Sequence, residues 1–307
     1  MHVFSKMLIM CVLAGTASAA KPDSDLQKQL ESMIAGYPGK VALYATHLTT
    51  GARVAINADQ PVQTASVIKL PIMLEAFYQA KSGKLDLNRR LALTKENQVP
   101  GSGVLQFMRP GLEPTVEDAI TLMIDVSDNT ATNLVIDAVG IPAVNQRLAE
   151  MGLKNTYLYK KVYKPAQGPM PPDQPKFGLG KTTAREMGEV MAAIQRCDLG
   201  ERKLCDRMIE ILRNQFYRES VPRYLETLDT TEKPSSVANK TGALDEVRND
   251  VALVMSNAGP IVISAFTWDN KDQTWTPDNH AYLLIARMSK AIVQAWSPKG
   301  VKHAAGK

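Results

Sequence analysis

The sequence predicts an α/β fold of the α+β kind, in which an antiparallel sheet is covered by helices and an all-helical lobe is inserted into the chain. Strand-like segments occur in two groups, an early pair within residues 41–56 and a late trio within residues 236–267. Short turns between neighbouring strands favour antiparallel pairing. The stretch between the two groups has helical periodicity. If both groups join one sheet, the cleft between sheet and lobe becomes the natural ligand site.

Residues 1–19 are predicted to be a secretory signal and not part of the fold. Lys6 supplies the positive charge, residues 7–14 the apolar core, and Ala17-Ser18-Ala19 a small-residue cleavage site. The apolar run is too short to span a bilayer, so no stable membrane span is expected. We therefore expect a periplasmic or secreted mature chain, residues 20–307, that forms a single domain.

Local patterns define the elements of the first half of the chain. Apolar residues at spacings of three and four indicate helices, and runs bounded by turn residues indicate strands. In chain order they predict a helix at 25–34, a hairpin of strands at 41–47 and 53–56, and a helix that opens near Ser66. They then predict a helix from Thr115 that breaks at 127–129, and a helix at about 131–139 that stops at Gly140 and Pro142. Thr115 begins a Thr-x-x-Asp cap.

The second half begins with an irregular segment and returns to strands. Residues 165–181 contain five prolines and three glycines, which is typical of a functional loop. After it a Thr183-x-x-Glu186 capping box opens a helix that is predicted to run to about 195. The patterns then predict strands at 236–241, 251–255 and 261–267, and an amphipathic helix at 280–296. On this layout the α/β lobe comprises about 20–60 and 215–307, and the helical lobe about 61–214.

Composition and charge limit the possible partners. The hydrophobic content of 45% and the charged content of 22% are typical of a chain that buries a substantial core. The net charge is +5, but no Lys/Arg run is long enough to serve as a nucleic-acid arm. We expect no nucleic-acid partner, a small-molecule substrate that is favoured when anionic, and a monomer. No paired-histidine spacing indicates a metal site, and no cofactor is expected.

Ser66 and Lys69 give the first indication of chemistry. At the start of a helix they lie on one face, one turn apart, among apolar residues. Burial disfavours an ammonium group, and a neutral amine beside a hydroxyl can convert that serine into a nucleophile. A Ser-x-x-Lys pattern is expected about once by chance in a chain of this length. Taken alone, it indicates an ordinary helix start far more often than a catalytic pair.

Two further clusters follow at positions that border the expected cleft. Ser127-Asp128-Asn129 falls at a helix break, where side chains can project into a pocket, and Lys240-Thr241-Gly242 falls at the end of a strand. Each has an ordinary structural alternative, a helix cap for the first and a strand end for the second. The occurrence of all three clusters in this order makes coincidence a poor explanation.

The ordered triple Ser-x-x-Lys, Ser-Asp-Asn and Lys-Thr-Gly resembles the signature of class A β-lactamases and penicillin-binding proteins. The resemblance extends over about residues 26–296. It implies a five-stranded antiparallel sheet flanked by helices, together with a helical lobe, which agrees with the layout above. It also implies a serine hydrolase that opens β-lactam rings through an acyl-enzyme.

The resemblance assigns a role to each matching position. Ser66 would be the acylated nucleophile, Lys69 would accept its proton, and Ser127 would donate a proton to the leaving nitrogen. Asn129 would contact the substrate's side-chain amide, and Lys240 and Thr241 would contact its carboxylate. The N–H groups of Ser66 and Ala243 would form the oxyanion hole. Arg248 would be a second carboxylate contact. The alternative for Arg248 is a surface charge on an edge strand.

One feature departs from the class A pattern. Those enzymes place a glutamate in the loop before the helix that begins at Thr183, where it activates the deacylating water. No glutamate occurs between Met151 and Arg185, and Asp173 is the only carboxylate there. A shorter side chain at a shifted position is a poor substitute for a base that must reach one water. We therefore expect slow or atypical deacylation.

Three functions remain open at this point. The first is a β-lactamase with an unusual deacylation base. The second is a related D,D-peptidase or esterase that acts on envelope substrates. The third is a covalent penicillin-binding sensor or sink that releases its adduct slowly.

Cys197 and Cys205 form an even pair once the signal, which contains Cys11, is removed. An exported protein reaches a compartment that permits disulfides. Residues 198–201, which follow Cys197, resemble a turn between two helices. Such a turn could bring the two sulfurs together. We predict a disulfide, with two free buried thiols as the alternative.

Overall fold

The computed structural model describes residues 21–225 and 235–302. The predicted signal and its cleavage site lie outside the described residues. Within the described part of the chain, no helix is both long and apolar enough to cross a membrane.

The main sheet joins the early and late strands as predicted. Its order is β1-β3-β2-β9-β8-β7, and the link between the two groups is the antiparallel pairing of β2 with β9. The strands are β1 (Lys21–Pro22), β2 (Lys40–His47), β3 (Ala52–Ile56), β7 (Val237–Leu244), β8 (Val247–Ser256) and β9 (Gly259–Trp268). The five antiparallel strands confirm the expected sheet. The sixth strand, β1, was not predicted, because it is only two residues long and pairs in parallel with β3.

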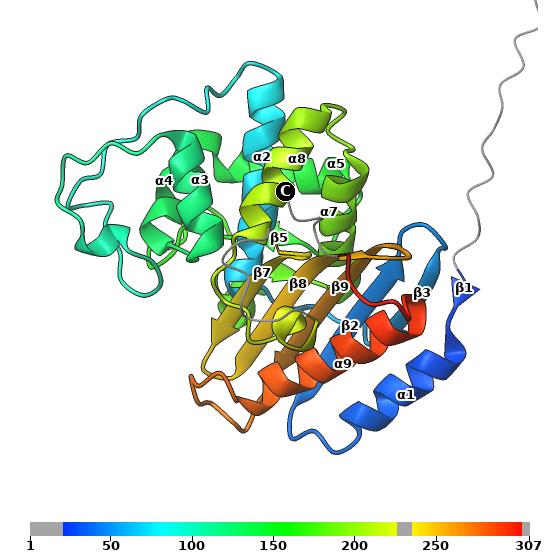
Figure 1. The fold of residues 1–307 in the computed structure, drawn as a ribbon. Helices are drawn as coiled ribbons and strands as arrows, with labels where there is room; N and C mark the ends of the chain where they lie inside the picture. Colours follow the sequence, from blue (N-terminus) through cyan, green and yellow to red (C-terminus); the bar gives the residue numbers. More distant parts are fainter. Residues whose placement is uncertain (1–20, 226–234, 303–307) are drawn as a thin grey trace, which may run out of the picture.

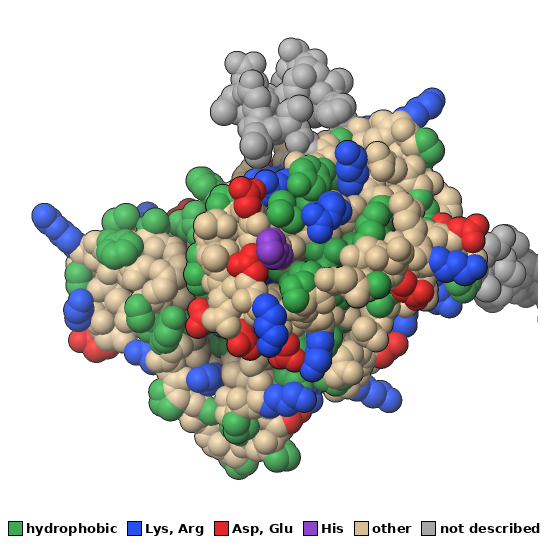
Figure 2. Space-filling view, turned by 90° about the horizontal axis from the view of Figure 1, so that it is seen from below, with side chains coloured by type: hydrophobic (Ala, Val, Ile, Leu, Met, Phe, Trp, Pro, Cys, Tyr) green, Lys and Arg blue, Asp and Glu red, His purple; other side chains and the backbone are tan. Residues whose placement is uncertain are grey.

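Both faces of this sheet are covered, which explains why its central strands are almost continuously buried. Along β9, Ile261, Ile263 and Ala265 pack with helices α1 (Ser24–Ile34) and α9 (His280–Trp296). Val262 and Phe266 belong to the second cluster, on the other face. The alternation follows from the two-residue period of a strand. Figure 1 shows α1 and α9 side by side across one face. Seen from below that view, charged side chains of both signs are scattered among apolar ones (Figure 2).

The remaining α-helices lie between β3 and β7 in the chain (Figure 1). They are α2 (Lys69–Lys81), α3 (Val116–Asp125), α4 (Asn129–Val139), α5 (Ile141–Glu150), α6 (Gln174–Phe177), α7 (Ala184–Arg196) and α8 (Arg202–Arg213). A small sheet of β4 (Val62–Gln63), β5 (Tyr157–Leu158) and β6 (Gly180–Thr182) lies among them. Helix α5 was not predicted. Its Pro142 occupies the first turn, where no N–H is needed, so the residue interpreted as a stop is part of a start.

The two predicted caps form to different extents. Thr115 and Asp118 make a complete reciprocal box at the start of α3. At α7 the Thr183 hydroxyl accepts from the N–H of Glu186, but the Glu186 carboxylate instead accepts from Asn155 and Thr156. That carboxylate thereby fixes the chain just before β5.

Cys197 and Cys205 are bonded to each other in the structure, with their Cα atoms 5.5 Å apart. The bond joins the C-terminal cap of α7 to α8. The formation of this bond in the isolated protein, and the treatment of residues 20–307 as a single domain, remain predictions.

Candidate active site

Ser66 lies in a 3₁₀ turn, Ala65–Ile68, that runs directly into α2, whose first residue is Lys69. The predicted helix start is therefore tighter than an α-helix over its first four residues. Ala65 has a φ of 43°, which is unfavourable for a residue with a Cβ. Such backbone strain costs about 1–3 kcal/mol and is concentrated at functional sites. Ser66 is half-buried, whereas its neighbours Ala65 and Val67 are buried.

Lys69 is completely buried, and its amine has three polar neighbours. Nζ donates to the Ser127 carbonyl oxygen at 2.7 Å, to Ser127 Oγ at 3.1 Å and to Asn129 Oδ1 at 3.0 Å. Burial lowers the pKa of Lys69 well below its usual value, and the charge of Lys240 lowers it further, whereas Asp128 opposes the shift. The environment expected from the sequence was purely apolar, but the amine in fact lies against the Ser-Asp-Asn segment.

Lys69 and Ser66 are adjacent along the turn but are not joined through their side chains. Within the described part of the chain, the three hydrogen bonds of Nζ all go to Ser127 and Asn129. Hydrogen bonds between catalytic groups are often long without substrate and tighten in the reacting complex. The predicted proton transfer therefore requires the Lys69 amine or an intervening group to shift.

Ser127 lies in the break between α3 and α4 with a φ of 54° and is almost completely buried. The break is stabilised by Asp128, whose carboxylate accepts from the N–H of Ala131 at 2.8 Å and from that of Leu105 at 2.8 Å. Asp128 thus caps α4 and binds the loop around Leu105 at the same time. Ser127 is left with its hydroxyl facing two lysines.

Lys240 projects from β7 to the same hydroxyl. Its Nζ lies 3.1 Å from Ser127 Oγ and 3.0 Å from the carbonyl oxygen of Thr241. Burial lowers the pKa of Lys240 to about 7, while the carboxylates of Asp250 and Asp125 act in the opposite direction. The structure therefore brings all three predicted clusters together around one hydroxyl group.

Gly242 allows β7 to lie directly against the turn that carries Ser66. A Cβ at Gly242 would be 2.8 Å from the carbonyl oxygen of Thr64 and 3.0 Å from the backbone nitrogen of Ser66. Any larger residue would push β7, the edge strand, away from that turn. Ala243 is the next residue on β7, so the two backbone N–H groups assigned to the oxyanion hole come from neighbouring segments.

Asn129 begins α4 and uses both ends of its amide. Oδ1 accepts from Lys69, and Nδ2 donates to the carbonyl oxygen of Pro100 at 3.1 Å. Its backbone N–H donates to the carbonyl oxygen of Ser102 at 3.0 Å. The amide is therefore held in one orientation, with one hydrogen and one lone pair remaining for a ligand.

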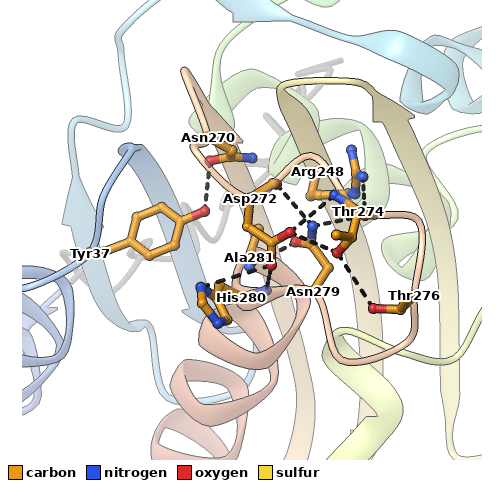
Figure 3. Close-up of polar contacts among 9 residues, drawn as sticks. All are labelled: Tyr37, Arg248, Asn270, Asp272, Thr274, Thr276, Asn279, His280 and Ala281. Atoms are coloured by element: carbon orange, nitrogen blue, oxygen red, sulfur yellow. Dashed lines mark hydrogen bonds and ion pairs between the residues drawn. The ribbon is translucent and has the colours of Figure 1, made fainter.

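Arg248 is completely buried in β8, between β7 and β9. The interpretation as a surface charge on an edge strand is therefore wrong. Its Nη2 donates to the carbonyl oxygen of Thr274 at 2.7 Å (Figure 3). The guanidinium also lies 4.5 Å from the centre of the Trp275 ring. The strand order explains the error. The interpretation treated β8 as an edge strand, whereas β9 pairs with it on the side opposite β7. A contact between Arg248 and a substrate carboxylate remains a prediction.

Asp173 already has partners within its loop. Its carboxylate accepts from the Tyr159 hydroxyl at 2.7 Å and from Lys181 Nζ at 2.6 Å. These hydrogen bonds lower the pKa of Asp173. A base of lowered pKa whose two oxygens bind the loop is a poor acceptor for a proton from water.

Two buried polar residues close to the site in the chain were not predicted. Asn133, one helical turn after Asn129, exchanges two hydrogen bonds with the backbone of Val162, at 3.0 and 2.9 Å. The i, i+4 spacing of the two asparagines was the available signal. Asp125 is buried two residues before Ser127, and its Oδ1 has no partner among the described residues. Burial raises the pKa of Asp125 to about 7.

Comparisons with known proteins agree with this geometry. β-Lactamase PSE-4 of Pseudomonas aeruginosa is 26% identical over 156 residues, and that match spans about half of each chain, 50% of this one and 52% of the relative. A β-lactamase structure from Sphaerobacter thermophilus is similar with a TM-score of 0.75 and 28% identity, covering 89% of this chain and 97% of that one. A PBP-A mutant in an acyl-enzyme complex with penicillin G is similar with a TM-score of 0.76 and 27% identity, covering 90% and 97%.

The model of the beta-lactamase enzyme family matches residues 25–296, a span that contains all three motifs and the described elements from β2 to α9. This chain belongs to the beta-lactamase enzyme family.

Proposed function

We propose that this protein is a serine hydrolase that opens β-lactam rings by forming an acyl-enzyme at Ser66. The observation that supports it best is the position of Lys69, an amine with a strongly lowered pKa that is buried one turn from Ser66. A lysine whose pKa is lowered gives up its proton more readily than usual, and its neutral amine can accept the serine proton as the oxygen attacks the lactam carbonyl. The N–H groups of Ser66 and Ala243 would then stabilise the oxyanion.

Ser127 completes the first half of the reaction. Its hydroxyl, 3.1 Å from Nζ of both lysines, can pass a proton to the ring nitrogen as the C–N bond breaks and recover one from Lys69. Lys240 and Thr241 would bind the carboxylate of the substrate, and Asn129 the amide of its side chain. Arg248 would contribute only if Trp275 and the Thr274 carbonyl released its guanidinium.

We further propose that hydrolysis of the acyl-enzyme is slow. The loop segment held by Asn133 carries Lys160, Lys161, Val162, Tyr163 and Lys164, without a carboxylate. Asp173, the only acid of the loop, is bound to Tyr159 and Lys181. A positioned base and a positioned water are both needed for deacylation, and the residues offer a candidate base for acylation, Lys69, but none for deacylation.

Slow deacylation makes a covalent penicillin-binding sensor or sink the second candidate, and a D,D-peptidase or esterase the third. Similarity to PBP-A, whose mutant holds penicillin G as an acyl-enzyme, favours the second. All three functions use the same acylation step and differ in the fate of the acyl-enzyme. We propose that the protein acts after export, because the substrates of all three functions, β-lactams and envelope peptides or esters, are found outside the cytoplasm.

Incubation with a chromogenic cephalosporin distinguishes these functions when colour and intact protein mass are followed together. We expect a burst of about one equivalent of product and then a slow steady phase in which the adduct persists. Rapid turnover without a detectable adduct would indicate an efficient β-lactamase. The absence of both colour and adduct would contradict the proposal, and the Ser66→Ala variant supplies the blank.

A further inference from the structure

Tyr163 is an exposed aromatic residue with no structural task among the described residues. Its side chain is 64% exposed, and it takes part in no hydrogen bond or ring contact in the part of the chain that the structure describes. Its φ is 54°, a conformation that residues other than glycine rarely adopt. A large ring at a strained and exposed position lowers stability without any compensating contact, which is more typical of a functional position than of a structural one.

The ring lies beside Asn129, across Gly101. A Cβ built on Gly101 would be 2.7 Å from Asn129 Nδ2 and 3.3 Å from both Cε2 and Oη of Tyr163. The absence of a side chain at Gly101 therefore leaves the amide and the ring facing a common space. Asn129 is the residue assigned to the side-chain amide of the substrate, so a group attached to that amide would reach this space.

The backbone on both sides of this space is held firmly. Val162 is fixed by its two hydrogen bonds to Asn133, and Lys161 makes an ion pair with Asp137. On the other side, Gln106 Nε2 donates to the carbonyl oxygen of Gly103 at 3.1 Å. A tyrosine on a fixed backbone has only two side-chain torsions left to order, so little entropy is lost when a ligand packs on it.

We propose that Tyr163 forms an aryl subsite, which packs against an aromatic or planar group carried by the substrate's side-chain amide. This inference rests on the proposed acylation at Ser66 and specifies its substrate class as acyl donors with an aryl side chain. Offset or edge-to-face packing of two rings is the expected contact, and it should favour aryl substrates by about three- to tenfold.

The test compares two β-lactams that share one nucleus. Benzylpenicillin carries a phenylacetyl amide, and 6-aminopenicillanic acid lacks it. The measurement is the second-order rate of acylation, followed by intact protein mass, for wild type and for Tyr163→Ala, Tyr163→Asn and Tyr163→Phe. Asparagine suits the left-handed backbone, so Tyr163→Asn removes the ring even if alanine is strained there. Tyr224→Ala, another exposed tyrosine, is the matched control.

We expect the ratio of the two rates to fall about three- to tenfold in both ring-free variants and to stay at the wild-type value in Tyr163→Phe and Tyr224→Ala. An unchanged ratio in the ring-free variants, or an equal loss for both β-lactams, would overturn the aryl subsite while leaving acylation intact. If neither β-lactam acylates the wild-type protein, that result contradicts the proposed function. The aryl subsite, which rests on that function, is then refuted as well.

Discussion

Lys69 and Lys240 direct their amines at one hydroxyl, each with Nζ 3.1 Å from Ser127 Oγ. Two ammonium groups around one buried oxygen repel each other, and both are cut off from water. Burial lowers the pKa of both lysines, and the charge of Lys240 lowers that of Lys69 further. The arrangement favours one neutral and one charged lysine, which suits a base and an anion contact.

Ser66→Ala should abolish covalent labelling by a fluorescent penicillin, because Ser66 carries the only hydroxyl of the turn Ala65–Ile68 that leads into α2. Lys69→Ala should slow labelling about a hundredfold or more, the usual contribution of a general base. Labelling is followed on denaturing gels. Ser82→Ala, an exposed serine after the end of the same helix, should label normally. Persistent labelling of Ser66→Ala would refute the assignment.

Binding of anionic β-lactams should weaken as the pH rises through about 7. A lysine of ordinary pKa stays charged to above pH 10, but Lys240, with its pKa lowered to about 7, loses its proton in the neutral range. The dissociation constant of the non-covalent complex, obtained from the saturation of the acylation rate, should therefore increase by up to about tenfold per pH unit above 7. A β-lactam whose carboxylate is esterified serves as the control and should give a dissociation constant that does not change with pH. An equally flat profile for the anionic substrate would contradict the role of Lys240.

Asp173→Asn should leave the slow steady phase of turnover unchanged. The Asp173 carboxylate is bound to Tyr159 and Lys181, and its lowered pKa makes it a weak base. The variant should instead loosen the loop, which limited proteolysis would detect as faster cleavage within residues 165–181. A marked drop in the deacylation rate would identify Asp173 as the base after all.

Val162→Glu should accelerate deacylation. Val162 is anchored to Asn133 and directly precedes Tyr163, whose ring reaches the space beside Asn129. A carboxylate at residue 162 would therefore enter a segment that borders the site. A positioned base should raise the steady rate by at least about tenfold and up to a hundredfold, measured as the decay of the mass adduct. Val162→Gln has the same shape without the basic oxygen. Equal rates for the two variants would show that residue 162 cannot reach the water.

The Cys197–Cys205 bond should be present in the exported protein and contribute roughly 2–3 kcal/mol to the free energy of unfolding, the lower end of the range for a disulfide, because the loop it closes is short. Alkylation of the denatured protein before and after reduction measures the free thiols. Two reactive thiols before reduction would rule the bond out. Reduced protein should unfold at a lower urea concentration.

The sequence alone determined the features that depend on local pattern. The main strands were predicted from their two-residue period, and the start of α3 from its capping residues. Both signals are local, because side-chain direction and cap hydrogen bonds involve neighbours in the chain. The order of the three motifs around Ser66, Ser127 and Lys240 predicted the site and the family. Pro142 was misinterpreted because proline suits the first turn of a helix as well as its end.

Only the tertiary structure decided which groups are buried together. The shared hydroxyl between Lys69 and Lys240, the enclosure of Arg248 under Trp275 and the bonds of Asp173 all join residues that are distant in the sequence or lie on different elements. Charge, pKa and exposure depend on the surroundings that packing creates. The sequence specifies the type of each residue, but the groups that the fold places within a few ångströms of that residue determine its chemistry.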